Sequence, residues 1–106
     1  MLLQIYFNVK DENAQAFEAM FDDVYVPAMQ VQAGYLGSRL LKTFPPPEGE
    51  AAGTEFNYQM NLFFDTEDNR VKWAESPEHE VAFPAAKALA ESWDAQKYDV
   101  VGEDGV

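Results

Sequence analysis

The sequence contains no cysteine and only one histidine. Without cysteine the protein can form no disulfide bond, no thiolate zinc site and no cysteine nucleophile, and one histidine cannot build a histidine-rich metal site. Basic residues are also few, because 7 lysines and arginines face 19 aspartates and glutamates, which gives a formal net charge of −12. This charge would repel nucleic acid and anionic lipid, so neither is expected as a partner. The acidity fits a solvated surface in a salty cytoplasm or, alternatively, a cationic ligand or partner.

Long apolar runs are missing as well. No run approaches the roughly 18 residues of a membrane span, and the N-terminal segment lacks the basic region and cleavage site of a signal peptide. We therefore expect a cytoplasmic protein that does not enter a membrane. Apolar residues make up 47% of the 106 residues, which is enough for one core, whereas two domains would each be too small. The expectation is a single domain over residues 1–106 that binds no metal and no cofactor.

Alternation of apolar and polar residues indicates strands with one apolar face, most clearly in FNYQMNLFF. The four predicted strands cover residues 2–9, 35–44, 56–64 and 95–102. Between the second and third, residues 45–55 contain three prolines and two glycines, which predicts an exposed loop. Residues 102–106 are expected to form a frayed tail.

Apolar residues at helical spacing fill the interval after the first predicted strand. They are Phe17, Phe21, Val24, Ala28 and Val31. Asp11 or Asn13 is expected to cap this helix, because their side chains can accept hydrogen bonds from its first backbone N–H groups. Pro27 is expected to bend the helix or to end its first part.

A second helical region is predicted in two parts. The first is a short helix with a cap at Asp65 or Thr66 and acidic residues in its first turn, where they suit the positive end of the helix dipole. The second has Ser76 as its cap with a proline directly after it, and it is expected to run through residues 81–93.

The resulting order, β-α-β-β-α-β, predicts an α+β protein with a ferredoxin-like antiparallel sheet and both helical regions on one face. The apolar parity of the strands would face the helices. The other parity mixes amides with aromatic side chains, namely Gln4, Tyr6, Asn8, Asn57, Gln59, Asn61 and Phe63. This outer face either closes over the same face of a second subunit or meets water.

Two passages of the sequence resemble one protein family. Residues 26–41, VPAMQVQAGYLGSRLL, and residues 61–79, NLFFDTEDNRVKWAESPEH, are similar to passages of the antibiotic biosynthesis monooxygenase family, which belongs to the dimeric α+β barrel superfamily. The resemblance implies a homodimer whose two sheets pack face to face into a barrel, with a ligand cavity in each subunit between sheet and helices. It also implies a monooxygenase without cofactor, in which a deprotonated phenol or quinol is itself the electron donor to dioxygen.

The residues that the family uses for catalysis are only partly present. Where its polyketide oxygenases carry an asparagine, a tryptophan and a further polar group, this sequence has Met60, Phe64 and Arg70. Where its haem-degrading members carry an asparagine, a tryptophan and the axial histidine, this sequence has Ile5, Trp73 and Phe83. Two other functions therefore stay open, namely a catalytically silent dimeric module that binds a small apolar ligand, and an isomerase or lyase.

Three residues are candidates for catalysis. His79 is the only side chain whose ordinary pKa lies near neutrality, so it is the natural general base for a phenol, although the glutamates around it would favour its charged form. The indole of Trp73 could donate a hydrogen bond to a ligand, and Arg39 could bind a carboxylate or phenolate. Structural roles are the alternative, with Trp73 as a core anchor, His79 as a helix-start residue and Arg39 in an outward ion pair.

The ligand cavity is expected to be apolar, because the side chains that face it from the strands and the first helix are apolar or aromatic. The expected substrate-binding residues are Phe7, Phe21, Tyr25, Met60, Leu62, Phe64 and Phe83. Trp73 would border the cavity, and His79 would be the nearest ionisable group. Such a lining selects a flat aromatic ligand by its shape.

Overall fold

The computed structural model describes residues 1–105, and Val106, the last residue of the predicted tail, lies outside the described residues. In chain order the elements are β1 (Leu2–Asn8), α1 (Asp11–Met20), the π-helical turn η1 (Phe21–Tyr25), α2 (Val26–Gln30), β2 (Tyr35–Lys42), β3 (Tyr58–Phe64), α3 (Glu67–Ala74), α4 (Pro77–Ala88) and β4 (Ser92–Tyr98). Among the described residues, no helix has the length and apolar character needed to cross a membrane.

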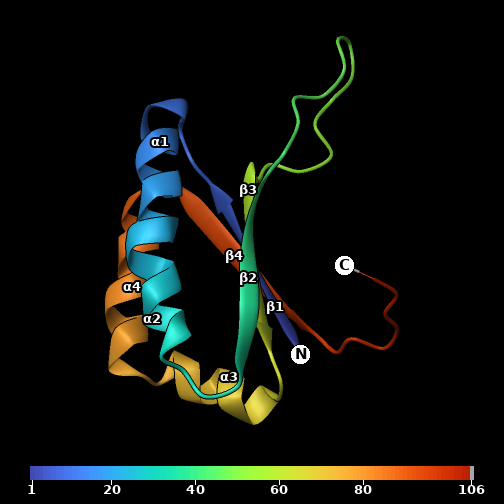
Figure 1. Ribbon diagram of the computed structural model, residues 1–106. Helices are drawn as coiled ribbons and strands as arrows, with labels where there is room; N and C mark the ends of the chain where they lie inside the picture. The colour runs from blue at the N-terminus through green and yellow to red at the C-terminus, as the bar shows by residue number, and fades with distance from the viewer. Residues whose placement is uncertain (106) are drawn as a thin grey trace.

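The four strands form one antiparallel sheet in the order β2-β3-β1-β4. All the helices lie on one face of this sheet, and no helix or strand among residues 1–105 covers the other face (Figure 1). The predicted α+β ferredoxin-like fold is therefore confirmed. The alternating pattern explains the arrangement, because a strand with one apolar face must place that face against another layer.

The core lies between the sheet and the helices, and its strand side follows the predicted parity. Every second residue of β3 is buried, from Tyr58 to Phe64, and β1 contributes Ile5 and Phe7. The ring of Phe7 meets the edge of Phe17 from α1 at a centroid distance of 5.1 Å. Aromatic packing of this kind joins the first helix to the centre of the sheet.

The first helical region is interrupted near the predicted position. The turn η1 widens to π-helical geometry over Phe21–Tyr25, and α2 then starts with Pro27 in its first turn. Proline has no N–H to donate to the carbonyl four residues earlier, so the α-helical ladder cannot pass through this position unchanged. The sequence predicts that Pro27 bends the helix or ends its first part. The α-helical pattern is interrupted, but the interruption covers Phe21–Tyr25, before Pro27.

The predicted cap of this first helix is wrong. The residue before α1 is Lys10, and no side chain caps the helix. Instead the backbone N–H of Asn13 donates to the carbonyl of Lys10 at 2.8 Å, while Asp11 occupies the first turn. The helix begins directly after the extended Lys10, so both predicted caps are already inside it, where Asp11 acts only through the helix dipole.

The caps of the second helical region are confirmed. Thr66 Oγ1 accepts a hydrogen bond from the backbone N–H of Asn69 at 3.2 Å, and Ser76 Oγ accepts one from the backbone N–H of His79 at 3.2 Å. The Ser76 hydroxyl also donates to the carbonyl of Trp73 at 2.7 Å. Ser76 therefore holds the end of α3 and the start of α4 together, with Trp73 and His79 on either side of it.

The sequence placed the last strand too late and the last helix too long. The structure ends α4 at Ala88 and begins β4 at Ser92, so Trp93 is a strand residue and not a helical one. Pairing with β1 decides this boundary, because β4 lies beside β1 from Ser92 to Tyr98. The local β-propensity of residues 95–102, which include two adjacent valines, predicted a strand there. The residues after Tyr98 have no strand partner in this sheet.

The loop between β2 and β3 extends away from the body of the protein (Figure 1). Residues 43–55 are exposed, and Phe44 is 95% exposed. Asn57 ends the loop in a way that the sequence did not predict, because its side chain donates to the carbonyl of Val9 at 2.7 Å and accepts from the Val9 N–H at 2.8 Å. Asn57 thus closes the end of β1 and does not belong to the free outer face.

We expect Gly34→Ala to lower the free energy of unfolding by roughly 1–3 kcal/mol, the usual cost of a strained backbone conformation. Gly34 has φ +76°, and a Cβ there would collide with Asp65 Oδ1 and Asn69 Nδ2, which are joined by a hydrogen bond of 2.8 Å. Gly53→Ala is the matched control, because a Cβ at Gly53 meets nothing within 4 Å. Urea unfolding curves that coincide for the two variants would contradict the expectation.

Candidate functional site

The helix layer leaves the edge strand β4 uncovered. All the residues of β4 are exposed, although Trp93 and Ala95 pair with Phe7 and Ile5 of β1, whose side chains face the helices. By the same parity Lys97 also faces the helix side. We call Trp93, Ala95 and Lys97 the β4 strip. Solvent reaches this part of the helix-facing side of the sheet.

One flank of α4 faces this strip. His79, Phe83 and Lys87 follow at a spacing of four residues, which places them on one side of the helix. The rings of His79 and Phe83 stack at a centroid distance of 5.3 Å, and Phe83 meets Trp93 edge to face at 4.9 Å. Lys87 Nζ lies 5.0 Å from the centre of the Phe83 ring. We call Trp73, His79, Phe83 and Trp93 the aromatic row.

The inner end of the row contains two buried donors without partners. Trp73 is 1% exposed, and its ring contacts His79 at 5.0 Å and Tyr25 at 5.8 Å between centroids. Among the described residues, the Trp73 Nε1 and the Tyr25 hydroxyl are the buried side-chain polar atoms that make no hydrogen bond. Buried donors are nearly always satisfied in proteins, so these two are the groups that a polar ligand atom would satisfy.

His79 is electrostatically prepared to act as a base. Its side chain is half-buried, and this burial is the main cause that lowers the pKa of the imidazole below 6.5. The negative charge of Glu80 opposes the shift, and the positive charges of Lys87 and Arg70 add smaller contributions to it. The sequence suggested that neighbouring glutamates would favour the charged form, and Glu80 does so, but burial outweighs its effect. Glu78 instead accepts a hydrogen bond from Gln32 Nε2 at 2.9 Å. Neutral imidazole therefore predominates at pH 7.

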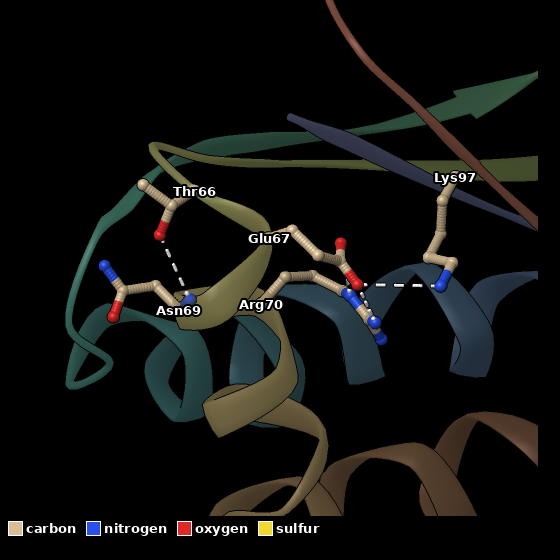
Figure 2. A network of polar contacts seen from close by, with 5 residues as sticks. All are labelled: Thr66, Glu67, Asn69, Arg70 and Lys97. Atoms are coloured by element: carbon tan, nitrogen blue, oxygen red, sulfur yellow. Dashed lines mark hydrogen bonds and ion pairs between the residues drawn. The ribbon is translucent and has the colours of Figure 1, made fainter.

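The other end of the β4 strip is held by a network of charges (Figure 2). Glu67 accepts a hydrogen bond from Arg70 Nε at 3.2 Å and lies 3.5 Å from Lys97 Nζ. Arg70 lowers the pKa of the Glu67 carboxyl, which therefore stays ionised. The network ties the start of α3, fixed by the Thr66 cap, to the last residue of the strip.

The predicted site residues separate into three places. Trp73 and His79 come together, as does Phe83 beside them. Arg39 pairs with Asn61 on the opposite parity of the sheet, so it belongs to the outer face and does not reach His79. The remaining predicted ligand contacts, which are fully or nearly fully buried in the core, are Phe7, Phe21, Tyr25, Met60, Leu62 and Phe64.

Sequence reasoning missed Trp93, Lys87 and the β4 strip. The sequence pattern predicts that Trp93 is helical, so it does not indicate the contact between Trp93 and Phe83. The four-residue spacing of His79, Phe83 and Lys87 is visible in the sequence, and it indicates that these three side chains lie on one side of α4. Among residues 1–105, no group of three or more histidine, aspartate and glutamate side chains is placed to hold a metal ion.

No family model matches the sequence, and no curated protein matches it significantly. Solved structures do resemble the fold. A variant of SnoaB, a cofactor-independent oxygenase from Streptomyces nogalater, is 16% identical, with a TM-score of 0.73 over 96% of this chain and 93% of that one. A variant of MhuD with two manganese protoporphyrin IX molecules bound in each active site is 20% identical, with a TM-score of 0.72 over 100% of both chains.

A third structure, a dimeric ferredoxin-like protein of unknown function from Jannaschia sp. CCS1, is 14% identical, with a TM-score of 0.72 over 93% of this chain and 97% of that one. Identities this low establish the fold alone. The ferredoxin-like fold that the sequence resemblance implies is therefore shared with an oxygenase, with a protein that binds manganese protoporphyrin IX and with a dimeric protein.

Proposed function

We propose that the protein is a monooxygenase that works without a cofactor on a flat aromatic or quinol-type small molecule. One observation carries the proposal. His79, a base that stays neutral, lies between the rings of Trp73 and Phe83 at the point where a buried aromatic cluster meets the exposed β4 strip. A phenolic ring placed against the aromatic row would have its hydroxyl within reach of this base.

The residues of the row have distinct roles in this reaction. His79 accepts the phenolic proton, and the resulting anion transfers electrons to dioxygen. For an anthrone-type substrate, a ring CH2 and O2 give a ring C=O and water, so no further reductant is needed. The indole N–H of Trp73 and the hydroxyl of Tyr25, both unpaired, would stabilise negative charge on an oxygen atom of the intermediate. The Tyr25 hydroxyl stays protonated, because burial raises its pKa.

The direct test measures oxygen consumption with the anthrone dithranol as substrate. We expect consumption well above autoxidation, with one quinone carbonyl formed for each O2 used. Substrate that binds without any oxygen uptake would reject the proposal and favour the second function, a dimeric module that binds a small aromatic ligand. The asparagine and tryptophan positions of the polyketide oxygenases read Met60 and Phe64 here, and the absence of these polar groups is the sequence feature that favours this second function.

We also propose that the protein is a homodimer closed by the outer faces of the two sheets. This face carries Tyr6, which donates to Gln4 Oε1 at 2.5 Å and lies 3.4 Å from the Tyr98 hydroxyl. Phe63 lies on the same parity. Aromatic side chains on a sheet face that no element covers are typical of an interface.

Light scattering should therefore give about twice the chain mass of 12.0 kDa at micromolar concentration. Phe63→Glu should shift the protein to the monomer, because it would bury an unpaired carboxylate between the two sheet faces. Val81→Glu is the control, since Val81 is 67% exposed on the helix side. A wild-type mass of 12.0 kDa would contradict the dimer.

A further inference from the structure

Positive charge gathers around the β4 strip, although the protein as a whole is strongly negative. The chain has 7 lysines and arginines against 19 aspartates and glutamates. Lys97 belongs to the strip, Arg70 shares the carboxylate of Glu67 with it, and Lys87 lies over Phe83 at the other end of the aromatic row. A chain with this net charge would be expected to carry mostly acidic side chains on an average surface patch, whereas the β4 strip is surrounded by basic ones.

Lys87 differs from the other two cations because it has no carboxylate partner. Within residues 1–105, the ion pairs join Lys10 to Glu91 and join both Arg70 and Lys97 to Glu67. The Lys87 ammonium rests on an aromatic ring instead. In a chain with so many acids, a free ammonium group beside an exposed aromatic surface is available to an anion from outside.

The surface beside Lys87 suits a flat ring. Trp93 is 46% exposed and stands edge-on to Phe83 at an interplanar angle of 90°. A planar ligand can therefore lie against one ring while its edge meets the other, in the geometries that aromatic pairs prefer. Glu80, whose charge acts on His79, is the acid that would oppose an anion here.

We propose that the aromatic row and the β4 strip bind a flat aromatic anion, and that Lys87 Nζ holds the carboxylate or phenolate of this ligand. The proposal rests on the proposed function for the location of the site, and it adds the charge of the substrate and the residue that selects it. A cationic ligand, which the overall acidity would attract, finds no free carboxylate in the row itself. Lys87 would also favour the deprotonated form of a phenol, which is the form that reacts with dioxygen.

The test compares two probes of equal shape, 2-naphthoate and the neutral 2-naphthamide. Binding is followed by the indole N–H signals in ¹H–¹⁵N spectra, which number only two because the chain has 2 tryptophans, and Trp93→Phe assigns them. We expect naphthoate to bind about fivefold more tightly than the amide, the upper range for a partly exposed ion pair. Added salt should reduce this preference.

Lys87→Gln should remove the preference by weakening naphthoate about fivefold while leaving the amide unchanged. Lys72→Gln is the matched control, because Lys72 and Lys87 are exposed lysines in the last turns of α3 and α4, so both variants lose the same helix-dipole interaction. Lys72→Gln should keep the preference of the wild type.

Three results would overturn the proposal. They are equal affinities of the two probes for the wild type, a naphthoate affinity that Lys87→Gln leaves unchanged, and a loss in Lys87→Gln that is the same for both probes. Failure of the catalytic proposal is distinguishable from these results. A charge preference that depends on Lys87 without oxygen uptake would reject the monooxygenase and keep the anion site, whereas oxygen uptake without any preference would do the opposite.

Discussion

Replacing His79 by alanine should reduce kcat for oxygen consumption about 100-fold, the lower range for loss of a general base. The reason is that His79 is the one ionisable member of the row, and the hydroxyl of Tyr25, whose ring contacts Trp73, stays protonated. The KM should change little, because Phe83 and Trp93 still present their rings to the substrate. Oxygen-electrode rates at several substrate concentrations separate the two parameters.

Trp73→Phe provides the comparison for this experiment. It keeps an aromatic ring in the core but removes the unpaired Nε1 donor, so we expect a smaller loss than in His79→Ala. Rates that survive in His79→Ala but collapse in Trp73→Phe would assign the reaction to hydrogen bonding by the indole and would contradict a base role for His79. Circular dichroism of both variants checks that neither loses the fold.

The pH dependence of kcat follows from the lowered pKa of His79. The imidazole is neutral above its pKa, which burial holds below 6.5, so kcat should be constant at neutral pH and should fall only in acid.

The lowered pKa of His79 also makes the free energy of unfolding depend on pH. The unfolded state takes up the proton at a higher pH than the folded state, so His79 lowers the free energy of unfolding as pH falls below 6.5.

Phe7→Ala should lower the free energy of unfolding by roughly 3–5 kcal/mol, the usual cost of removing a large buried aromatic side chain. Phe7 is fully buried and packs edge-on against Phe17 at 5.1 Å, so its loss leaves a cavity at the centre of the sheet. Domains of this size have a total stability of about 5–15 kcal/mol. The substitution should therefore remove a substantial part of the total stability.

Phe44→Ala is the control for this prediction, because it removes the same atoms from a side chain that is 95% exposed. Urea unfolding midpoints should coincide for Phe44→Ala and the wild type and should shift strongly for Phe7→Ala, with similar slopes. A shift of less than about 1 kcal/mol for Phe7→Ala would mean that the core re-packs around the missing ring, against the rigidity expected of a dense interior.

The sequence by itself determined the order of the elements, the face of β1 and β3 that enters the core, and the caps at Thr66 and Ser76. These features depend on interactions between residues close in the chain, such as the two-residue alternation and a hydroxyl three residues before an N–H. The pairing of Trp73 with His79 belongs with them, because Ser76 lies between these residues and bonds to the backbone of both.

Only the tertiary structure decided the bounds of β4, the location of Arg39 on the outer face of the sheet and the neutral state of His79. The strand bounds depend on pairing with β1, whose residues are more than 80 positions away in the chain. The charge of His79 depends on its burial, which outweighs the glutamate charge that its sequence neighbours supply. The contact of Trp93 with Phe83 likewise exists only because β4 returns to the edge of the sheet beneath α4. Contacts between distant segments set each of these properties, and no local pattern in the sequence reports them.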